Sequence, residues 1–378
     1  GKNILIPKVL EKRLELNIAS LNEEEITILK KLSIFETPLS EIIILKYIIT
    51  ELEERKIYID LKSKGFLEDK ISDQGILVGF TNNLLRNILY LKLNDKNKIE
   101  MHFKASVFLE EILHETDYYM EEFLIHLQKG ESYKKAYFYT NKYAKVQDVI
   151  GNSSKAIEYY KKALNYPDAP NKCEVAINIA KLYEKKSKHE KSFEFYDIAN
   201  QLAIQNDQLE IEIYTLLEMI IIKLNDITDI TTGIDYSLNC VRRLLDRITY
   251  PKGEIYYYYA ISLKYRIEYN NKLTFINAEK ALNICHENKI KEDVYGWINL
   301  ILVRIYIKKG NYREAKKLCS NAQEVFVNNN NINGELFSKL YYATISKEEG
   351  NSNETILEQY FEVVKLSNKT KVYKREIL

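Results

Sequence analysis

Cysteine, histidine and serine side chains are the groups from which most metal sites and nucleophilic active sites are built. The sequence has four cysteines and five histidines among its 378 residues. It contains no C-x-x-C pair, no H-E-x-x-H spacing and no G-x-S-x-G motif. Cys285 and His286 are adjacent, so they would point to different faces of a helix. The sequence therefore predicts no catalytic residue, no metal site and no cofactor, and the protein is expected not to be an enzyme.

The remaining ionisable groups fit helix surfaces. Carboxylates lie beside lysines, as in Glu184-Lys185-Lys186, which is typical of a solvated helix face. The histidines are spaced irregularly, and we expect solvated or partly buried helix residues at His102, His114, His126, His189 and His286.

The tyrosines indicate binding rather than catalysis. There are 30 of them, and the run Tyr256–Tyr259 covers all sides of a helix, so at least one must face a groove or solvent. Rigid aromatic side chains beside arginine, lysine and asparagine are typical interface anchors. They could hold a peptide backbone or a carboxylate.

Composition limits the partners and the compartment. The 55 basic and 54 acidic residues leave a net charge of +1, which provides no bulk attraction to nucleic acid or to an anionic membrane. No apolar run approaches the length of a membrane span, and no signal-peptide pattern is present. Unpaired cysteines favour a reducing cytosol, so a cytoplasmic location is expected. Scarce glycine (12) and proline (5) favour long helices.

An internal repeat orders the second part of the chain. Stretches beginning at Gly151, Ser187 and Gly310 share one pattern, and a degenerate copy begins at Gly350. Glycine or serine stands at a turn and a small residue follows five positions later. An aromatic or apolar residue comes four further on, and alanine three after that. Glycine ends a helix cheaply, because it adopts the left-handed conformation, and small residues let two helices approach closely.

This repeated order resembles the tetratricopeptide (TPR) family, in its longer variant of about 40 residues per unit. Ala163 and Ala199 are 36 residues apart, and Ala281 and Ala322 are 41 apart. The resemblance implies an all-α fold, a TPR-like right-handed helical solenoid over residues 116–378, with five or six helix pairs in 133–378. In this family the first helix of each pair lines a concave groove. Projecting that geometry places the following candidate ligand-binding residues along the groove: Asn141, Lys145, Lys181, Tyr256, Tyr259, Arg266, Trp297 and Arg304.

The first part has a different pattern. After residues 1–20, expected to be a linker, Asn22 and the carboxylates that follow it predict a helix start. Two further helices are expected near 42–49 and 51–63. Strand-like segments at 66–71 and 76–80 flank a turn and predict a hairpin. Three helices and a hairpin make a small winged-helix domain, which we place at 21–115.

This region resembles the winged-helix segment of STAND and AAA-type signalling ATPases, including the maltose-regulator type. The matching residues are Leu85-Arg86, Tyr90 and the stretch Met101-His102-Phe103-Lys104-Ala105, followed by Leu109-Glu110. Asn82 stands where many members have a histidine, and in several members this region senses nucleotide phosphates. The resemblance implies an ATPase domain before the segment, but the chain has no G-x-x-x-x-G-K-[ST] loop. We therefore expect a fragment of a longer chain, or a relative that lost its ATPase.

The leading hypothesis is a non-catalytic regulatory or sensor region of a signal-transduction protein, binding a partner protein, a peptide or a small inducer in the TPR groove. One alternative is a free-standing TPR peptide receptor of the quorum-sensing type. Another is a transcription regulator that binds DNA through the winged helix. The expected recognition helix is neutral, with Glu51, Glu53, Glu54 and Asp60 against Arg55, Lys56, Lys62 and Lys64. DNA readers need a net positive charge, so nucleic acid is not the expected partner.

Overall fold

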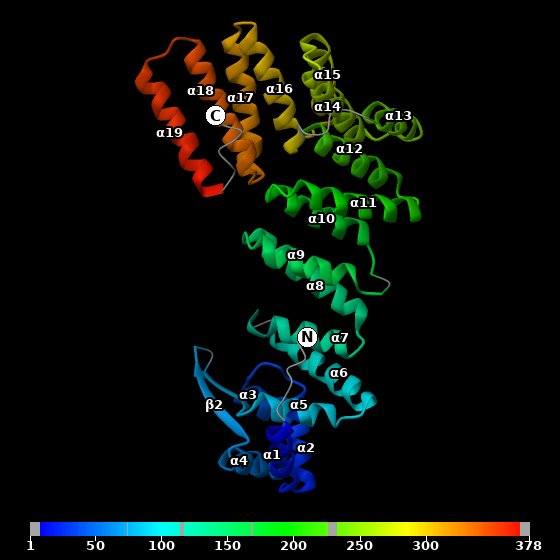
Figure 1. Cartoon of the computed structure of the whole chain (residues 1–378), viewed down its shortest axis with the longest axis vertical. Coiled ribbons are helices and arrows are strands. Elements are labelled where there is room, and N and C mark those ends of the chain that lie inside the picture. The colour runs from blue at the N-terminus through cyan, green and yellow to red at the C-terminus, as the bar shows by residue number, and fades with distance from the viewer. Residues whose placement is uncertain (1–7, 74, 114–116, 168, 226–232, 371–378) are drawn as a thin grey trace. The chain divides into compact units, whose positions relative to one another are not determined.

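The computed structural model describes residues 8–73, 75–113, 117–167, 169–225 and 233–370. The chain divides into two compact units, an N-terminal unit of residues 1–150 and 165–169 and a C-terminal unit of residues 151–164 and 170–378 (Figure 1). The predicted domain boundaries at residues 20 and 115 stay predictions. Within the segment expected to be a linker, residues 8–19 form helix α1 (Lys8–Ala19), which buries Leu14 and Ile18.

The N-terminal unit continues with helix α2 (Glu23–Ser33). It begins as predicted, because the Asn22 side chain accepts a hydrogen bond from the Glu25 backbone and Glu25 accepts one from the Asn22 backbone. This reciprocal capping satisfies backbone donors that a helix start otherwise leaves without partners. The following elements are strand β1 (Leu39–Ser40), helix α3 (Glu41–Ile43), the π-helical turn η1 (Ile44–Ile48) and helix α4 (Leu52–Ser63).

A small antiparallel sheet completes this part of the unit. The predicted hairpin is confirmed as β2 (Leu67–Ser72) and β3 (Gly75–Phe80), with Leu67 opposite Phe80. Strand β1 was not expected. It pairs Leu39 with Val78, so the strand order is β1-β3-β2.

Further helices extend the N-terminal unit. Helix α6 packs against α7, and α7 packs against α8. Their bounds and those of the neighbouring elements are α5 (Asn83–Leu91), α6 (Asp95–Ile112), η2 (Asp117–Tyr119), α7 (Met120–Lys129) and α8 (Tyr133–Val149).

The C-terminal unit is built from helices that follow one another in pairs. Each helix packs against the next along the chain, and the first helices α12, α14, α16 and α18 also pack against one another in turn. The bounds are α9 (Ser153–Leu164), α10 (Lys172–Lys185), α11 (His189–Gln205), α12 (Leu209–Asn225), α13 (Ile234–Leu245), α14 (Pro251–Ile267), α15 (Asn271–Asn288), α16 (Asp293–Lys308), α17 (Tyr312–Asn328), α18 (Ile332–Glu348) and α19 (Asn353–Thr370). We call α10, α12, α14, α16 and α18 the first helices of their pairs.

The repeat residues take the roles that the pattern predicts. Gly310 ends α16 in the left-handed conformation, with φ of 69°, and Ser187 takes the same conformation after α10, with φ of 52°. The repeat alanines are completely buried where helices meet, which allows the close approach that larger side chains would prevent. They are Ala163, Ala199, Ala281 and Ala322.

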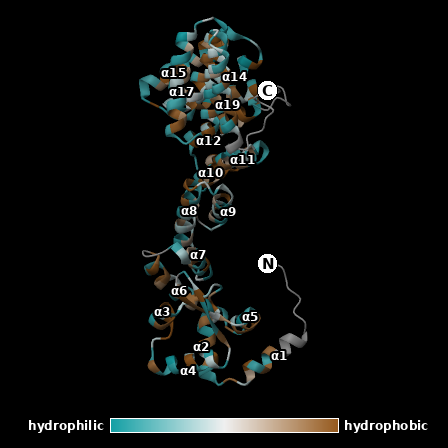
Figure 2. Cartoon of the chain, turned by 90° about the vertical axis from the view of Figure 1, so that its left-hand side faces the viewer, coloured by the Kyte–Doolittle hydropathy of each residue, from teal (hydrophilic) through white to brown (hydrophobic). Residues whose placement is uncertain are grey.

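Hydrophobic and hydrophilic residues alternate along the helices of each unit, as expected for helices that bury one face (Figure 2). Among the described residues, no helix combines the length and the apolar character needed to cross a bilayer.

Candidate ligand-binding face

The structure distributes the predicted groove residues over both units. Asn141, half-buried, and Lys145, exposed, lie on α8 in the N-terminal unit. The other predicted residues lie on three first helices of the C-terminal unit, namely Lys181 on α10, Tyr256, Tyr259 and Arg266 on α14, and Trp297 and Arg304 on α16.

Two carboxylates that were not among the candidates also lie on first helices of the C-terminal unit. Glu184 on α10 is half-buried and Glu218 on α12 is only 9% exposed. The Tyr196 hydroxyl donates to Glu184 Oε2 at 3.1 Å. Burial, and then the charge of Glu218, raises the pKa of Glu184 to about 8. Burial also raises the pKa of Glu218, against a hydrogen bond from Tyr214 and the charge of Lys181. Glu184 is therefore largely protonated at neutral pH.

Tyrosines surround this carboxylate pair. The Tyr214 ring centroid lies 6.4 Å from that of Tyr196 and 5.4 Å from that of Tyr256. Lys181 Nζ lies 5.4 Å from the Tyr214 centroid and Lys252 Nζ lies 5.7 Å from it. Burial raises the pKa of all three phenols well above 10, so they remain neutral hydrogen-bond donors. The cluster thus combines aromatic faces with charged groups of both signs.

The Tyr259 phenol is influenced by the charges of both the carboxylates and the basic residues. Burial raises its pKa, the Arg266 charge opposes the increase, and Glu218 and Glu184 add to it. The phenol therefore lies within electrostatic range of both signs of charge. Burial likewise raises the pKa of Tyr341 on α18, and Arg304 and Arg266 oppose that increase. We call Glu184, Glu218, Tyr259, Arg266 and Arg304 the polar strip; it is acidic at α10 and α12 and basic at α14 and α16.

A small pocket of about 10 Å³ marks the basic end of the polar strip. Arg266, Arg304 and Lys308 line it, together with the start of α15 and the buried side chains of Ile301 and Ile305. These three cations take part in no ion pair with any described residue. The pocket therefore combines uncompensated positive charge with an apolar wall.

Two predicted residues are mainly packing residues in this structure. Trp297 is half-buried, and its ring lies 4.8 Å from Phe326 and 5.8 Å from Phe337, measured between centroids. Tyr259 is only 7% exposed. Little of the Tyr259 ring is therefore accessible to a ligand.

The expectation that Glu184 lies on a solvated face was wrong. The neighbouring Lys185 and Lys186 are exposed as expected, but Glu184 turns toward Tyr196 on the following helix. A tyrosine 12 residues away along the chain gives no periodic signal. Glu218 could have been identified from the sequence, because it is the single carboxylate in the mainly apolar stretch from Ile213 to Ile222.

The N-terminal unit also contains an ionisable cluster that the sequence analysis missed. His102 on α6 and His126 on α7 are fully buried, which corrects the expectation of solvated or partly buried residues. Their Nδ1 atoms lie 2.6 Å apart, and His102 Nε2 lies 3.0 Å from the Tyr90 hydroxyl. Residues 102 and 126 belong to different helices, so their meeting depends on tertiary packing. Of the other histidines, His189 and His286 are exposed, and His114 lies outside the described residues.

Glu122 on α7 lies at the other end of this cluster, next to His126. Its Oε1 lies 3.2 Å from His126 Nε2, and it accepts hydrogen bonds from the backbone of Glu36 and Thr37 at 2.8 and 3.1 Å. Burial lowers the pKa of His102 to about 3, and the charges of His126 and Lys129 add to this effect. Tyr90, both histidines and Glu122 therefore form a chain of close polar contacts, in which burial keeps His102 neutral. We call it the histidine chain.

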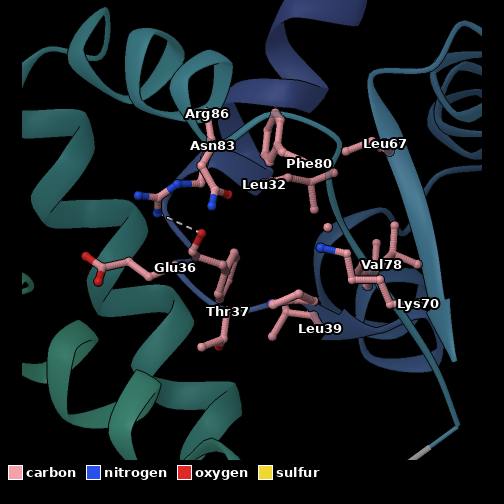
Figure 3. A pocket seen from close by; sticks show the side chains of 14 residues that line it. Leu32, Glu36, Thr37, Leu39, Leu67, Lys70, Val78, Phe80, Asn83 and Arg86 are labelled. Atoms are coloured by element: carbon pink, nitrogen blue, oxygen red, sulfur yellow. Dashed lines mark hydrogen bonds between the residues drawn. The ribbon is translucent and has the colours of Figure 1, made fainter. Parts of the chain in front are cut away.

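A cavity of about 110 Å³ lies beside the sheet of the N-terminal unit (Figure 3). Apolar side chains including Leu32, Leu39 and Phe80 line part of it, while the Lys70 amine and the Asn83 amide turn toward it. Arg86 on the same wall donates to the Phe35 carbonyl oxygen at 2.9 Å. The nearby Asn82 caps α5, because its side chain accepts a hydrogen bond from the Leu84 backbone.

Other reactive groups provide no site in the part of the chain that the structure describes. No group of three or more histidine, cysteine, aspartate or glutamate residues is placed there to hold a metal ion. Burial raises the pKa of the Cys285 and Cys319 thiols to about 12, so neither is a reactive thiolate at neutral pH.

Comparisons with known proteins concern the fold. Neither a protein-family model nor a curated protein sequence matches the chain. A solved Rap protein, in complex with competence and sporulation factor, is 14% identical, with a TM-score of 0.50; the match covers 93% of this chain and 88% of that one. This likeness and the helix pairs confirm the predicted all-α, TPR-like solenoid.

A second solved structure is that of a signal transduction ATPase with numerous domains (STAND) protein with a tetratricopeptide repeat sensor, from Pyrococcus horikoshii. It is 16% identical, with a TM-score of 0.41, and the match covers 98% of this chain and 60% of that one. The present chain thus spans about three fifths of the length of that protein.

Proposed function

We propose that the chain is a non-catalytic regulatory region of a signal-transduction protein and that its C-terminal unit binds a partner protein or a peptide on the polar strip. The observation that carries this proposal is the strip itself. It places a carboxylate pair, Tyr259 and two arginines without an ionic partner on successive first helices. Arginines without an internal ion pair are available to a ligand, and arginine is enriched among the residues that dominate binding.

A protein or peptide ligand suits the chemistry better than a small apolar one. The strip extends over four first helices, from α10 to α16, rather than enclosing a deep cavity. Tyr256 offers a half-buried aromatic surface, with Lys181 near the same cluster. Aromatic and arginine anchors spread along a face are typical of protein–protein recognition. The similar Rap protein was solved with competence and sporulation factor, which agrees with a role of this kind.

Within this function, we favour the sensor region of a STAND-type protein. The motif resemblance around His102 and the elements at residues 23–80 support a winged helix that precedes the repeats in the sequence. A ligand would act by binding one arrangement of the domains more tightly than another.

A free-standing peptide receptor is the second candidate. The Rap match favours it, because it covers most of both chains. The two candidates differ in what precedes residue 1. The mass of the native protein separates them: about 45 kDa supports the free-standing receptor, and a much larger mass supports the sensor region.

DNA binding through α4 is disfavoured by its ion pairs. Lys62 pairs with Glu41 at 2.9 Å and with Asp69 at 2.5 Å, and Lys64 pairs with Glu25 and Asp60. Lysines whose charge is balanced by a neighbouring carboxylate attract phosphates only weakly.

Selection of random peptides against the full chain tests the proposed function. We expect the enriched peptides to bind at least tenfold more weakly to a Lys181→Ala, Tyr256→Ala double variant. The matched control is Tyr236→Ala on α13, which removes a tyrosine that is 74% exposed. Failure to enrich any peptide, or equal loss of binding in the control, would contradict the proposal.

A further inference from the structure

The cavity beside the sheet of the N-terminal unit has the features of a second binding site, separate from the polar strip (Figure 3). We propose that it binds a short aliphatic carboxylic acid, with the aliphatic part inside the cavity and the carboxylate at Arg86. The N-terminal unit would then respond to a small organic acid. This proposal does not depend on what the C-terminal unit binds.

The first argument is the distribution of apolar and polar residues around the cavity. Lys70 and Asn83 are exposed, so they mark the side that faces solvent. An apolar interior with a few polar groups at its entrance is the common form of a small-molecule site. The apolar side chains of the lining are buried, each at most 7% exposed, and include Leu32, Leu39, Ile44, Leu67, Val78 and Phe80.

The second argument is the volume of the cavity, which is about 110 Å³. An apolar cavity of about 150 Å³ in another protein admits benzene, so this one accepts about four or five non-hydrogen atoms. That is the size of the carbon chain of a short branched acid such as isobutyrate. A nucleotide is much too large for this space, and an inorganic ion would leave the apolar side chains without a contact.

The third argument is the charge of Arg86. Glu36 and Lys70 also line the cavity, but Glu36 pairs with Lys129 at 2.9 Å and Lys70 pairs with Glu68 at 2.9 Å. Arg86 forms no ion pair with any residue that the structure describes, and its hydrogen bonds go to neutral oxygens. Its positive charge is therefore available to an anionic ligand.

The fourth argument is an unsatisfied donor on the same guanidinium group. Arg86 donates through its terminal nitrogens to the Phe35 carbonyl oxygen at 2.9 Å and to Asn87 Oδ1 at 2.7 Å. Its Nε is buried and has no hydrogen-bond partner within the described part of the chain. A buried donor without an acceptor is unfavourable. A ligand carboxylate would supply both an acceptor and the opposite charge.

One wall of the cavity is held in place from two sides. Arg86 on α5 donates to the Phe35 carbonyl oxygen, and Glu122 on α7 accepts from the backbone of Glu36 and Thr37 at 2.8 and 3.1 Å. A wall that is fixed before the ligand arrives lowers the entropic cost of binding. The site is therefore formed without its ligand.

Titration of the full chain with isobutyrate at millimolar concentrations tests this inference, followed by NMR spectra of the leucine and valine methyl groups. We expect saturable shifts of the Leu39 and Val78 methyl signals. Isobutyramide has the same shape without the charge, and it should bind at least fivefold more weakly. Inorganic phosphate has the charge without the aliphatic part, and it should leave these signals unchanged.

The absence of saturable shifts with isobutyrate would overturn the inference. Equal affinity for isobutyramide would show that no charge is recognised, and saturable shifts with phosphate would show that no aliphatic group is needed. Either result would also overturn it.

Variants assign the binding to the cavity. Arg86→Gln should weaken isobutyrate binding about tenfold and remove the preference over isobutyramide, because the positive charge is lost. The matched control is Arg55→Gln on α4, since Arg55 is also half-buried and donates to a backbone carbonyl oxygen, that of Leu45, at 3.0 Å. Equal weakening in this control would overturn the inference.

A second variant keeps the test valid if Arg86→Gln does not fold. Asn83 is exposed and its amide turns toward the cavity, so Asn83→Phe should preserve the fold and obstruct the entrance. We expect it to weaken isobutyrate binding about tenfold. Unchanged affinity in Asn83→Phe and in Arg86→Gln would place isobutyrate elsewhere on the protein and overturn the inference.

Discussion

The histidine chain of the N-terminal unit and the polar strip of the C-terminal unit both contain buried ionisable groups, but they differ in how those groups are satisfied. In the histidine chain, His102, His126 and Glu122 make their polar contacts with one another, with Tyr90 and with the backbone of the same unit. In the polar strip, Arg266 and Arg304 have no ionic partner among the described residues, and the two carboxylates repel each other. A closed network stabilises a fold, whereas an open one keeps binding capacity available to a ligand.

This difference predicts opposite responses to pH. Burial keeps His102 neutral in the folded N-terminal unit, so acid should weaken that unit. The carboxylate pair depends on a retained proton, so alkali should weaken the C-terminal unit. The following predictions are arranged from the largest expected effect to the smallest.

Breaking the histidine chain should have the largest effect. We expect His126→Ala to lower the free energy of unfolding of the N-terminal unit by about 3 kcal/mol, because it leaves buried polar partners unsatisfied and opens a cavity. Hydrogen exchange of the amides in α6 and α7 measures this directly. The control is His189→Ala, an exposed position. Equal effects of the two substitutions would show that the buried chain does not stabilise the unit.

Acid should weaken the same unit by a smaller amount. His102 has a pKa of about 3 when folded and an ordinary value of 6.5, so the unfolded chain takes up the proton first as pH falls. The contribution of His102 is complete above pH 6.5 and is lost progressively toward pH 3. Lowering the pH from 6.5 to 5 should cost about 2 kcal/mol, since each unit of pKa difference is worth about 1.4 kcal/mol.

Exchange in α6 and α7 again provides the measurement, at several pH values between 3 and 7. A His102→Gln variant should show a shallower pH dependence. If the stability of this variant depends on pH as steeply as that of the unmodified chain, groups other than His102 cause the acid sensitivity.

The smallest effect is expected at the carboxylate pair, and it should have the opposite sign. Glu184 has a raised pKa, so its contribution is complete below its ordinary value of 4.5 and is lost as pH rises through about 8. Glu184→Gln resembles the protonated form. It should therefore stabilise the C-terminal unit at pH 8 and have a much smaller effect at pH 5.

Trp297 is the single tryptophan, so its fluorescence during denaturation reports on the C-terminal unit. Glu190→Gln, on an exposed position of α11, is the matched control. The difference in stability between Glu184→Gln and the unmodified chain should change between pH 5 and pH 8. If it stays the same, the pKa of Glu184 is not raised.

Local patterns predicted the elements of both units well. The cap at Asn22, the hairpin at 67–80 and the left-handed turns at Gly151 and Gly310 follow from side chains that act on their own backbone within a few residues. The repeat also predicted the buried alanines, because they recur at the same position of each repeat in the sequence.

The functional groups were predicted less well, because their partners are distant in the sequence. Arg266 and Arg304 were proposed from helix position and occupy the basic end of the strip. Glu184 was missed, because its environment is created by Tyr196 and Glu218, which neighbouring helices supply. The pairing of His102 with His126 likewise depends on how α6 packs against α7.

The central claim is that the polar strip is a ligand-binding surface. Hydrogen exchange of the full chain, with and without a saturating peptide from the random selection, tests it most directly. We predict slower exchange at the C-terminal half of α10 and in α12, α14 and α16, with the second helices α11, α15 and α17 little changed. Protection confined to the second helices, or to the N-terminal unit, would contradict the account.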